Sequence, residues 1–336
     1  MISATTAKDR VLSGMQPSGA LHIGNWMGAL DNWVNMQDVY DSYFMVADYH
    51  SLTTGYHDTR GLPTLVFQMV VDWLAAGVDP KRSVIFRQSD VPEHAELHLL
   101  LSMITPLGWL ERVPSYKEKL KELAQRDIHT YGFLGYPVLM SSDILLYRAS
   151  KVPVGQDQVP HVELTREIVR RFNGLYGEVL LEPEAILTEA KVLPGLDGKK
   201  MSKSYGNTLA LGESGESIAK KIRVMMTDPA RVRKSDPGHP EVCPVFSLHK
   251  IFTGSQQVQE IDSACRKAQI GCVDCKAILA SQINAQLDPI RERRIEWEEH
   301  PQQVQEILQQ GAREAQKTAH DTLTMVKDAM HLNSLE

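Results

Sequence analysis

The sequence predicts an α/β protein in which a doubly wound parallel sheet is followed by a C-terminal all-helical domain. Short β-branched runs alternate with helical patterns over the first two-thirds of the 336 residues. Such alternation is typical of a parallel sheet with helices on both faces. After about Gly206 the strand pattern ends and only helical patterns follow. We therefore expect an α/β domain over residues 1–205 and a helical domain over residues 206–336.

The individual elements follow from the residue pattern in chain order. Apolar runs at 11–13, 43–46 and 83–86 predict buried strands. A helix is expected over 62–76, where Gly77 ends it, and another over 159–172, where Asn173 and Gly174 end it. In the second domain, helices are expected over 216–226, 256–267, 273–287 and 302–330.

The composition excludes several classes of protein. Apolar residues make up 43% of the chain and charged residues 23%, which is typical of a globular protein. No apolar run approaches the ~20 residues that a membrane helix needs. Residues 1–10 hold no hydrophobic targeting core, so we expect a cytoplasmic protein. Because the net charge is −6, binding to nucleic acid would have to use local basic patches.

Two segments carry the strongest functional signal. The lysine loop, which is bordered by glycines, is Lys199-Lys200-Met201-Ser202-Lys203-Ser204. The histidine segment, which follows the first strand, is Pro17-Ser18-Gly19-Ala20-Leu21-His22-Ile23-Gly24-Asn25. A lysine-rich loop alone is usually a solvated turn. Together the two segments resemble the signatures of class I aminoacyl-tRNA synthetases, whose fold is Rossmann-like, with Asn25 in place of the family's second histidine.

The two segments predict an ATP site. A turn that leaves a strand and begins a helix brings backbone N–H groups to a phosphate, and His22 can donate to an α-phosphate oxygen. Gly24 lets adenine or ribose lie against the helix, and Asn25 can donate as a neutral amide. For His22 and Asn25 the alternative is an ordinary capped helix N-terminus.

Forming an adenylate requires alignment and stabilisation of charge more than covalent help. The resemblance implies that Lys200 and Lys203 contact the departing pyrophosphate. Lys119 matches a further phosphate-binding lysine, although a charged surface helix is the alternative. The expected catalytic residues are thus His22, Lys119, Lys200 and Lys203, with Mg²⁺ accompanying ATP. The expected ATP-binding residues are Gln16, Ser18, Gly19, His22, Gly24, Asn25, Gly155, Asp157, Lys200, Met201, Ser202 and Lys203.

Three further segments resemble those of bacterial tryptophanyl-tRNA synthetases, and the likeness runs over nearly the whole chain. They are residues 46–50, 136–145 and 152–158. The resemblance implies a ligase that activates L-tryptophan with ATP and transfers it to tRNA(Trp). It places Asp157 near the ribose, and around the amino and carboxyl groups of tryptophan it places Gln16, His50, Tyr136 and Gln158.

The helix around Pro137 is expected to recognise the ring of the amino acid. Pro137 suits the first turn of a helix, and four residues then share one face: Tyr136, Met140, Asp143 and Tyr147. Met140 is a pliable surface for a ring. A buried carboxylate is costly unless a donor meets it, and the indole N–H is purely a donor. Phenylalanine would leave Asp143 unpaired, so the pocket should reject it.

Several alternatives stay open at this point. Asp143 could face solvent, and His50 could be a hydrogen-bonded core histidine. The chain could be a tyrosyl-tRNA synthetase, but no pattern near Leu12 or Ala47 matches a pocket for a tyrosine hydroxyl. A related nucleotidyltransferase, or a tRNA-binding paralogue without catalysis, is a third possibility. The intact lysine loop and the long helical C-terminal region argue against both.

The four cysteines form a compact group in the second domain: Cys243, Cys265, Cys272 and Cys275. In a cytoplasmic chain such spacing favours a metal over disulfides, and thiolates alone suit zinc or an iron–sulfur cluster. The spacing resembles that of a subset of tryptophanyl-tRNA synthetases with a [4Fe-4S] cluster, which implies a structural cluster here. Zn²⁺ is one alternative, and four thiols without a metal are another.

The resemblance also implies partners. The helical domain is expected to read the anticodon of tRNA(Trp), and the chain is expected to form a homodimer and not to bind a membrane. The basic side chains proposed to contact tRNA are Arg231, Arg233, Lys234, Arg291, Arg293 and Arg294. A solvated charged face is the alternative for them.

Overall fold

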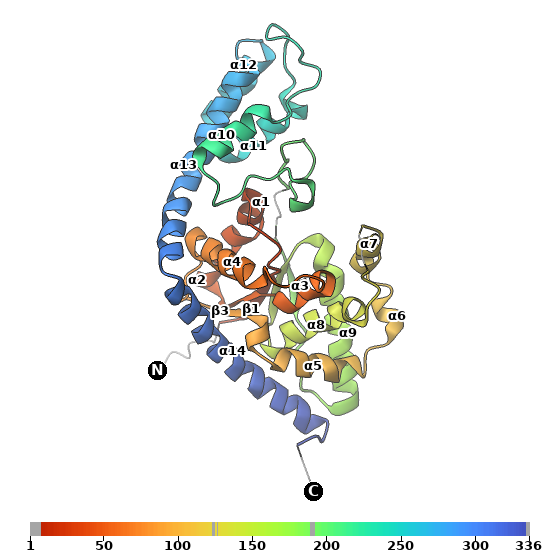
Figure 1. Cartoon of the computed structure of the whole chain (residues 1–336). Coiled ribbons are helices and arrows are strands. Elements are labelled where there is room, and N and C mark those ends of the chain that lie inside the picture. The colour runs from red at the N-terminus through yellow and green to blue at the C-terminus, as the bar shows by residue number, and fades with distance from the viewer. Residues whose placement is uncertain (1–7, 123–124, 126, 189–191, 334–336) are drawn as a thin grey trace, which may run out of the picture.

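At the centre of the molecule lies a parallel sheet of five strands in the order β3-β2-β1-β4-β5 (Figure 1). The structure is a computed structural model that describes residues 8–122, 125, 127–188 and 192–333. The strands are β1 Arg10–Met15, β2 Asp41–Val46, β3 Ser83–Arg87, β4 Lys151–Val154 and β5 Glu184–Leu187. The strand order reverses direction between β1 and β4, which confirms the predicted doubly wound sheet.

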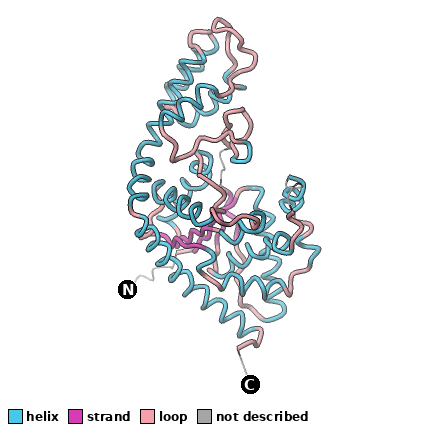
Figure 2. The backbone as a smooth tube through the Cα atoms, in the orientation of Figure 1, coloured by secondary structure: helices cyan, strands magenta, loops and turns pink. Residues whose placement is uncertain are grey.

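Both faces of the sheet are covered by helices, as Figure 2 shows for the strands in magenta. Phe44 and Val46 of β2 belong to one apolar core, whereas Tyr43 and Met45 belong to the other. The first core includes side chains of α2 Asp31–Val39 and α4 Leu62–Ala76, and the second those of α5 Glu93–Ser102, α8 Tyr131–Leu146 and α9 Val159–Tyr176. Strands covered on both sides produce continuous apolar runs in the sequence.

The remaining helices of the first part connect these layers. They are α1 Ile23–Asn25, α3 Asp48–Gly55, α6 Leu107–Leu110 and α7 Pro114–Glu122. A π-helical turn, Trp26–Leu30, joins α1 to α2, so that the chain from Ile23 onward is one interrupted helix. Such turns widen a helix locally and are common at functional sites.

The observed ends of α4, α8 and α9 agree only in part with the predicted ones. The bounds of α4 are as predicted, because Gly77 adopts a left-handed conformation (φ 110°) that ends the helix. The predicted end of α9 was wrong: the helix continues to Tyr176, and the amide of Asn173 instead binds the following loop at Leu180 O (2.9 Å). Pro137 lies inside α8 and not in its first turn, because Thr130 caps an earlier start.

The C-terminal part is helical, as predicted. Its helices are α10 Gly215–Val224, α11 Pro244–Phe252, α12 Ser255–Arg266, α13 Cys272–Glu299 and α14 Pro301–Ala329. Helices α10 to α12 and the beginning of α13 project away from the sheet (Figure 1). Helix α13 is much longer than predicted, because it continues through Pro289. Helix α11 was not predicted.

Helix α14 returns to the sheet and packs against β3. A Cβ atom at Gly311 would lie 1.9 Å from the carbonyl oxygen of Ile85, so only glycine fits at this contact. Tyr43 of β2 also shares a hydrogen bond with Thr318 of this helix (3.2 Å). The domain boundary near residue 205 stays a prediction, and the last helix shares a core with the α/β part.

Within the described ranges, no helix combines the length and the apolar character needed to cross a membrane. Residues 1–7, which belong to the segment examined for a targeting core, lie outside the described ranges.

Candidate functional site

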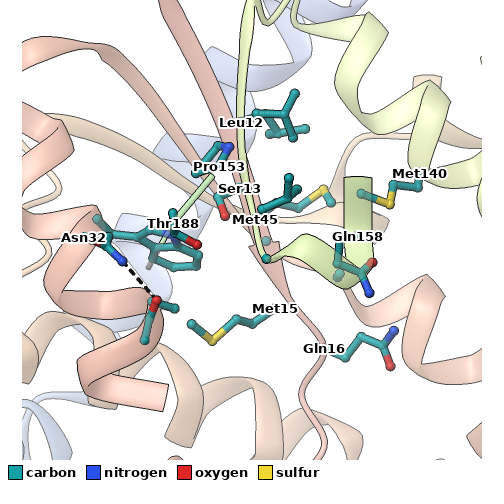
Figure 3. A pocket seen from close by; sticks show the side chains of 18 of the residues that line it. Leu12, Ser13, Met15, Gln16, Asn32, Met45, Met140, Pro153, Gln158 and Thr188 are labelled. Atoms are coloured by element: carbon teal, nitrogen blue, oxygen red, sulfur yellow. Dashed lines mark hydrogen bonds between the residues drawn. The ribbon is translucent and has the colours of Figure 1, made fainter. Parts of the chain in front are cut away.

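A cavity of about 550 Å³ opens beside β1 and β4, where the strand order reverses. Ligands of doubly wound sheets bind at this place. Nine of the predicted binding residues line the cavity: Gln16, Gly24, Asn25, His50, Met140, Asp143, Gly155, Asp157 and Gln158. Figure 3 draws part of the lining, including Leu12, Met45 and Met140 on the apolar side and the amides of Gln16 and Gln158. The π-helical turn contributes Gly28 and Ala29.

The histidine segment forms a tight cap at the start of α1. The Nδ1 atom of His22 accepts from the backbone N–H of Gly24 (3.1 Å), and Asn25 Oδ1 accepts from the backbone N–H of His22 (3.1 Å). Burial, with Lys203 nearby, lowers the pKa of His22 to about 4. The ring is therefore neutral with its proton on Nε2. His22 Nε2 and Asn25 Nδ2 both keep a donor for a ligand.

Lys203 joins the lysine loop to the histidine segment. Its ammonium donates to Gly19 O (2.7 Å) and lies 3.4 Å from the hydroxyl of Ser18. Burial lowers the pKa of Lys203. Met201 is buried nearby, whereas the side chain of Lys200 is exposed. The two predicted ATP segments thus meet in space although about 180 residues separate them.

Sequence reasoning missed the residue that shapes the lysine loop. Asn207 is buried; its Oδ1 accepts from Ser202 N (2.8 Å), and its Nδ2 donates to Asp197 (2.6 Å) and to Lys200 O (3.2 Å). A Cβ atom at Gly195 would lie 2.3 Å from this amide. An asparagine just after a functional loop is a signal that could have been noticed, since such side chains often organise turns.

Asp143 lines the cavity, yet it is not the isolated carboxylate that the sequence suggested. Its Oδ1 accepts from Gln88 Nε2 and His94 Nδ1, and its Oδ2 accepts from His50 Nε2, each at 2.7 Å. Tyr147 then donates to the other nitrogen of His94 (2.7 Å). Although burial raises the pKa of Asp143, His50 and His94 hold it well below its usual value. The carboxylate is ionised, with one lone pair of Oδ2 left.

Gln88 and His94 were not predicted. Gln88 directly follows β3, and polar side chains at the carboxyl ends of parallel strands are a general signal for a site. Its orientation is fixed, because its Oε1 accepts from Tyr49 N (3.1 Å). No sequence spacing connects His94 of α5 with Asp143 of α8, since only the packing of the two helices brings them together.

Tyr136 and Lys119 lie in a different group and are not among the cavity-lining residues. The ammonium of Lys119 lies 4.9 Å from the centre of the Tyr136 ring. The Tyr136 hydroxyl bonds to Ser115 (2.8 Å), which also bonds to the buried His161 (2.7 Å). Burial, with Lys119 nearby, lowers the pKa of His161 to about 4, so this histidine is neutral.

The predicted 155–158 segment forms a short turn after β4. Gln158 Nε2 donates to Asp157 Oδ2 (2.8 Å), which ties the two predicted ligand-binding side chains together. A Cβ atom at Gly155 would lie 2.8 Å from Asp157 Oδ1. Glycine therefore allows the carboxylate to approach the backbone where the cavity opens.

The four cysteines line one small cavity of about 20 Å³ between α11, α12 and α13. All are free thiols; burial and the neighbouring cysteines raise the pKa of Cys275 to about 12. Arg231 lies 3.6 Å from Cys265 Sγ and 4.0 Å from Cys272 Sγ. Over the described residues, however, no three cysteine, histidine or acidic side chains form a group that could hold a metal ion, so the iron–sulfur prediction is not supported.

Most of the basic side chains predicted to contact tRNA are engaged within the protein. Arg231 is buried and donates to Ile270 O (2.8 Å). Arg294 forms an ion pair with the buried Asp72 (2.7 Å). Arg291 bonds to Asn284 (2.7 Å), while Arg293 donates to a carbonyl of α4. The sequence shows where cations cluster but not which of them have partners. Arg233 and Lys234 are exposed.

The chain is similar to known proteins over most of its length. Residues 4–288 match the family described as tRNA synthetases class I (W and Y). The tryptophan–tRNA ligase of Thermotoga maritima is 51% identical over 96% of this chain and 99% of its own length. The ligase of Ralstonia nicotianae is 43% identical over 96% of this chain and 98% of its own.

Among solved structures, the tryptophanyl-tRNA synthetase of Campylobacter jejuni, complexed with ADP and tryptophan, superposes with a TM-score of 0.89. It is 37% identical and covers 96% of this chain and 100% of its own. Tyrosyl-tRNA synthetase from Archaeoglobus fulgidus, at 21% identity, shares the fold. The chain belongs to the class I tRNA synthetases for tryptophan and tyrosine, and within them to the tryptophan–tRNA ligases.

Proposed function

We infer that the cavity beside β1 and β4 activates L-tryptophan with ATP and then passes it to tRNA(Trp). In the first step a carboxylate oxygen of tryptophan attacks the α-phosphorus of ATP, and the bond to the bridging oxygen breaks as pyrophosphate leaves. In the second step the 2′-hydroxyl of the terminal adenosine attacks the acyl carbon, and AMP leaves. The observation that carries this proposal is the ionised carboxylate of Asp143 in the cavity wall.

The remaining lone pair of Asp143 suits the indole N–H of tryptophan. Three donors already occupy its other positions, so a fourth donor completes its hydrogen bonding. Met140 offers a polarisable surface to the ring, and Met45 and Leu12 line the same cavity. Phenylalanine offers no donor, and it would leave a buried charge incompletely solvated.

Polar side chains elsewhere in the cavity suit the ends of the substrate. The amides of Gln16 and Gln158 can each donate and accept, as the carboxylate and ammonium of an amino acid require. His50, whose Nε2 binds Asp143, keeps its Nδ1 as an acceptor for the ammonium group. We also assign Asp157 to the ribose. Tyr136 does not line the cavity, so it can bind the amino acid only if it and its neighbours Ser115 and Lys119 move toward the ligand.

The histidine segment and the lysine loop suit the triphosphate. His22 and Asn25 each keep a donor, and Ser18 and Gly19 lie against Lys203. We propose that Lys203 exchanges its contact with Gly19 for phosphate oxygens and that Lys200 joins it. Charge on the leaving pyrophosphate would then be stabilised without covalent help. Mg²⁺, held mostly by phosphate oxygens and water, would accompany ATP.

We propose that the four cysteines bind a metal cofactor with a structural role. The four thiols line one cavity, and they would have to move together to become ligands of an iron–sulfur cluster or of Zn²⁺. The Arg231 guanidinium can offset thiolate charge. Iron and sulfide content with visible absorbance identifies a cluster, and zinc content with no colour identifies the alternative. Cys265→Ser should lower the melting temperature and the absorbance. Unchanged absorbance, metal content and melting would remove the proposal.

The expected partners remain proposals. We propose that tRNA(Trp) meets the helical part near Arg233 and Lys234, and that the enzyme is a cytoplasmic homodimer. Leu99 of α5, Met103 directly after that helix and Leu107 of α6 are more than half exposed, and they offer an apolar surface to a second copy. Light scattering of the wild type and of a Met103→Glu variant would test this surface.

ATP–pyrophosphate exchange with each of the twenty amino acids tests the proposed function. Exchange should depend on tryptophan, and charging of tRNA(Trp) should follow. Exchange that depends on tyrosine would favour the other branch of the family, and exchange with no amino acid would indicate a protein without activation chemistry.

A further inference from the structure

Asp72 is a buried carboxylate in the middle of α4, and the proposed chemistry does not use it. The residue is 2% exposed, and its neighbours in the chain, Val71 and Trp73, are fully buried. One oxygen accepts from Arg294 Nε (2.7 Å) and the other from the backbone N–H of Leu21 (3.3 Å). A carboxylate in such surroundings is costly unless it is paired. Its presence here therefore calls for a reason.

Leu21 is the residue before His22 in the histidine segment. Its carbonyl accepts from Leu211 N (2.9 Å), and Ile23 N donates to Leu209 O (3.0 Å). The histidine segment thus pairs in antiparallel fashion with residues 209–211, which follow the lysine loop. Asp72 binds one end of this pairing through the Leu21 N–H.

Arg294 reaches the same place from α13. Its guanidinium also pairs with Glu298 and lies close to Gly212, where a Cβ atom would be 2.8 Å from Arg294 Nε. The side chain therefore fills the space beside the segment that follows the lysine loop. One ion pair between α4 and α13 consequently contacts the histidine segment at Leu21 and the segment after the lysine loop at Gly212.

We propose that Asp72 and Arg294 are positioning residues for the ATP half of the reaction. Together they fix the histidine segment relative to the lysine loop, so that His22 and Lys203 face the same phosphates. The proposal rests on the assignment of these two segments to ATP. It also makes the position of α13, which begins at Cys272, a determinant of how well ATP is held.

Steady-state exchange kinetics of Asp72→Asn and Arg294→Gln test this proposal. Each variant should lower kcat/KM for ATP by about 10- to 100-fold, as expected when reacting groups are misplaced, and leave KM for tryptophan within about twofold. Because both residues act through one contact, the double variant should lose less than the product of the two single effects. Arg294→Lys, which keeps the charge, should recover part of the loss.

Arg293→Gln is the matched control. Arg293 donates to Ala75 O on α4 (2.6 Å), so its loss weakens the same pair of helices without touching Asp72. The control should lower the melting temperature while ATP kinetics stay within twofold. Equal losses for ATP and tryptophan, or an ATP effect of Arg293→Gln as large as that of Arg294→Gln, would reduce the ion pair to a structural contact.

The proposal stays testable if Asp72→Asn does not fold or if the wild type shows no exchange activity. If Asp72→Asn does not fold, Arg294→Lys and Arg294→Gln still decide the proposal by the ratio of their ATP and tryptophan effects. If the wild type shows no tryptophan-dependent exchange, the proposed function fails. Calorimetric binding of ATP alone to the wild type and to Arg294→Gln then tests positioning separately, and equal affinities would overturn it.

Discussion

Replacing Asp143 by asparagine changes one atom of the cavity wall and tests how the ring of tryptophan is recognised. The variant should fold, because its amide oxygen can still accept from Gln88 and His94. Its NH₂ group would take the position of Oδ2, where His50 can accept after a change of tautomer. The second amide hydrogen would then point into the cavity, and the indole N–H would meet a donor.

The magnitude follows from the contact that is lost. A hydrogen bond to a charged group contributes about 1.5–3 kcal/mol, which corresponds to an increase in the tryptophan KM of about 10- to 150-fold. KM for ATP should stay within about twofold. For the wild type, KM should be higher by the same factor for benzothienylalanine, which has sulfur in place of the N–H, than for tryptophan. Asp143→Asn should abolish this preference.

Exchange kinetics with both amino acids, together with thermal melting, measure these effects. Asp48→Asn is a suitable control, because Asp48 is a second buried carboxylate that bonds to Tyr49 N (3.0 Å) but does not line the cavity. If Asp143→Asn keeps both the wild-type tryptophan KM and the preference over benzothienylalanine, Asp143 does not bind the indole N–H.

Three further predictions concern the ATP segments. Lys203→Ala should slow exchange by about 10²–10³-fold, as expected when a charge-stabilising donor is lost, and its affinity for tryptophan should stay near the wild-type value. The control variant Lys199→Ala should exchange at close to the wild-type rate. Normal turnover of Lys203→Ala would contradict this prediction. Gly195→Ala should raise the ATP KM more than the tryptophan KM, because its Cβ atom would displace Asn207 from the lysine loop, and equal changes would argue against that role. The pKa of His22, lowered to about 4 by burial with Lys203 nearby, should appear in an NMR titration and rise in Lys203→Ala, and a wild-type value near 6.5 would be inconsistent with a neutral ring.

Much of the fold could be predicted because its signals are local. The strands β2 and β3 are largely buried on both faces and therefore appear as apolar runs. Gly77 ends α4 with a conformation that other residues avoid. The start of α8 was predicted too late, because Pro137 was placed in the first turn and the N-cap at Thr130 was not considered. A proline usually breaks a helix, but tertiary packing keeps this one inside a buried helix. The predicted end of α13 was also wrong, because the helix was expected to end before Pro289 and instead continues through it.

The site was predictable only in part, because spacing along a helix identifies a face but not the partners across it. Met140 and Asp143 do line the cavity, as their spacing on α8 indicates. The donors around Asp143 come from other elements, and no spacing along the chain indicates that His94 reaches it. Ion-pair partners cannot be recognised from spacing either: Arg294 was expected to contact tRNA, and it is half-buried and paired with the buried Asp72.

A crystal structure of the protein with tryptophan bound tests the central claim most directly. We expect the indole nitrogen within about 2.7–3.2 Å of Asp143 Oδ2, with Gln88, His94 and His50 still on the carboxylate. A tryptophan whose indole nitrogen lies away from Asp143, or one bound outside the cavity beside β1 and β4, would contradict the account.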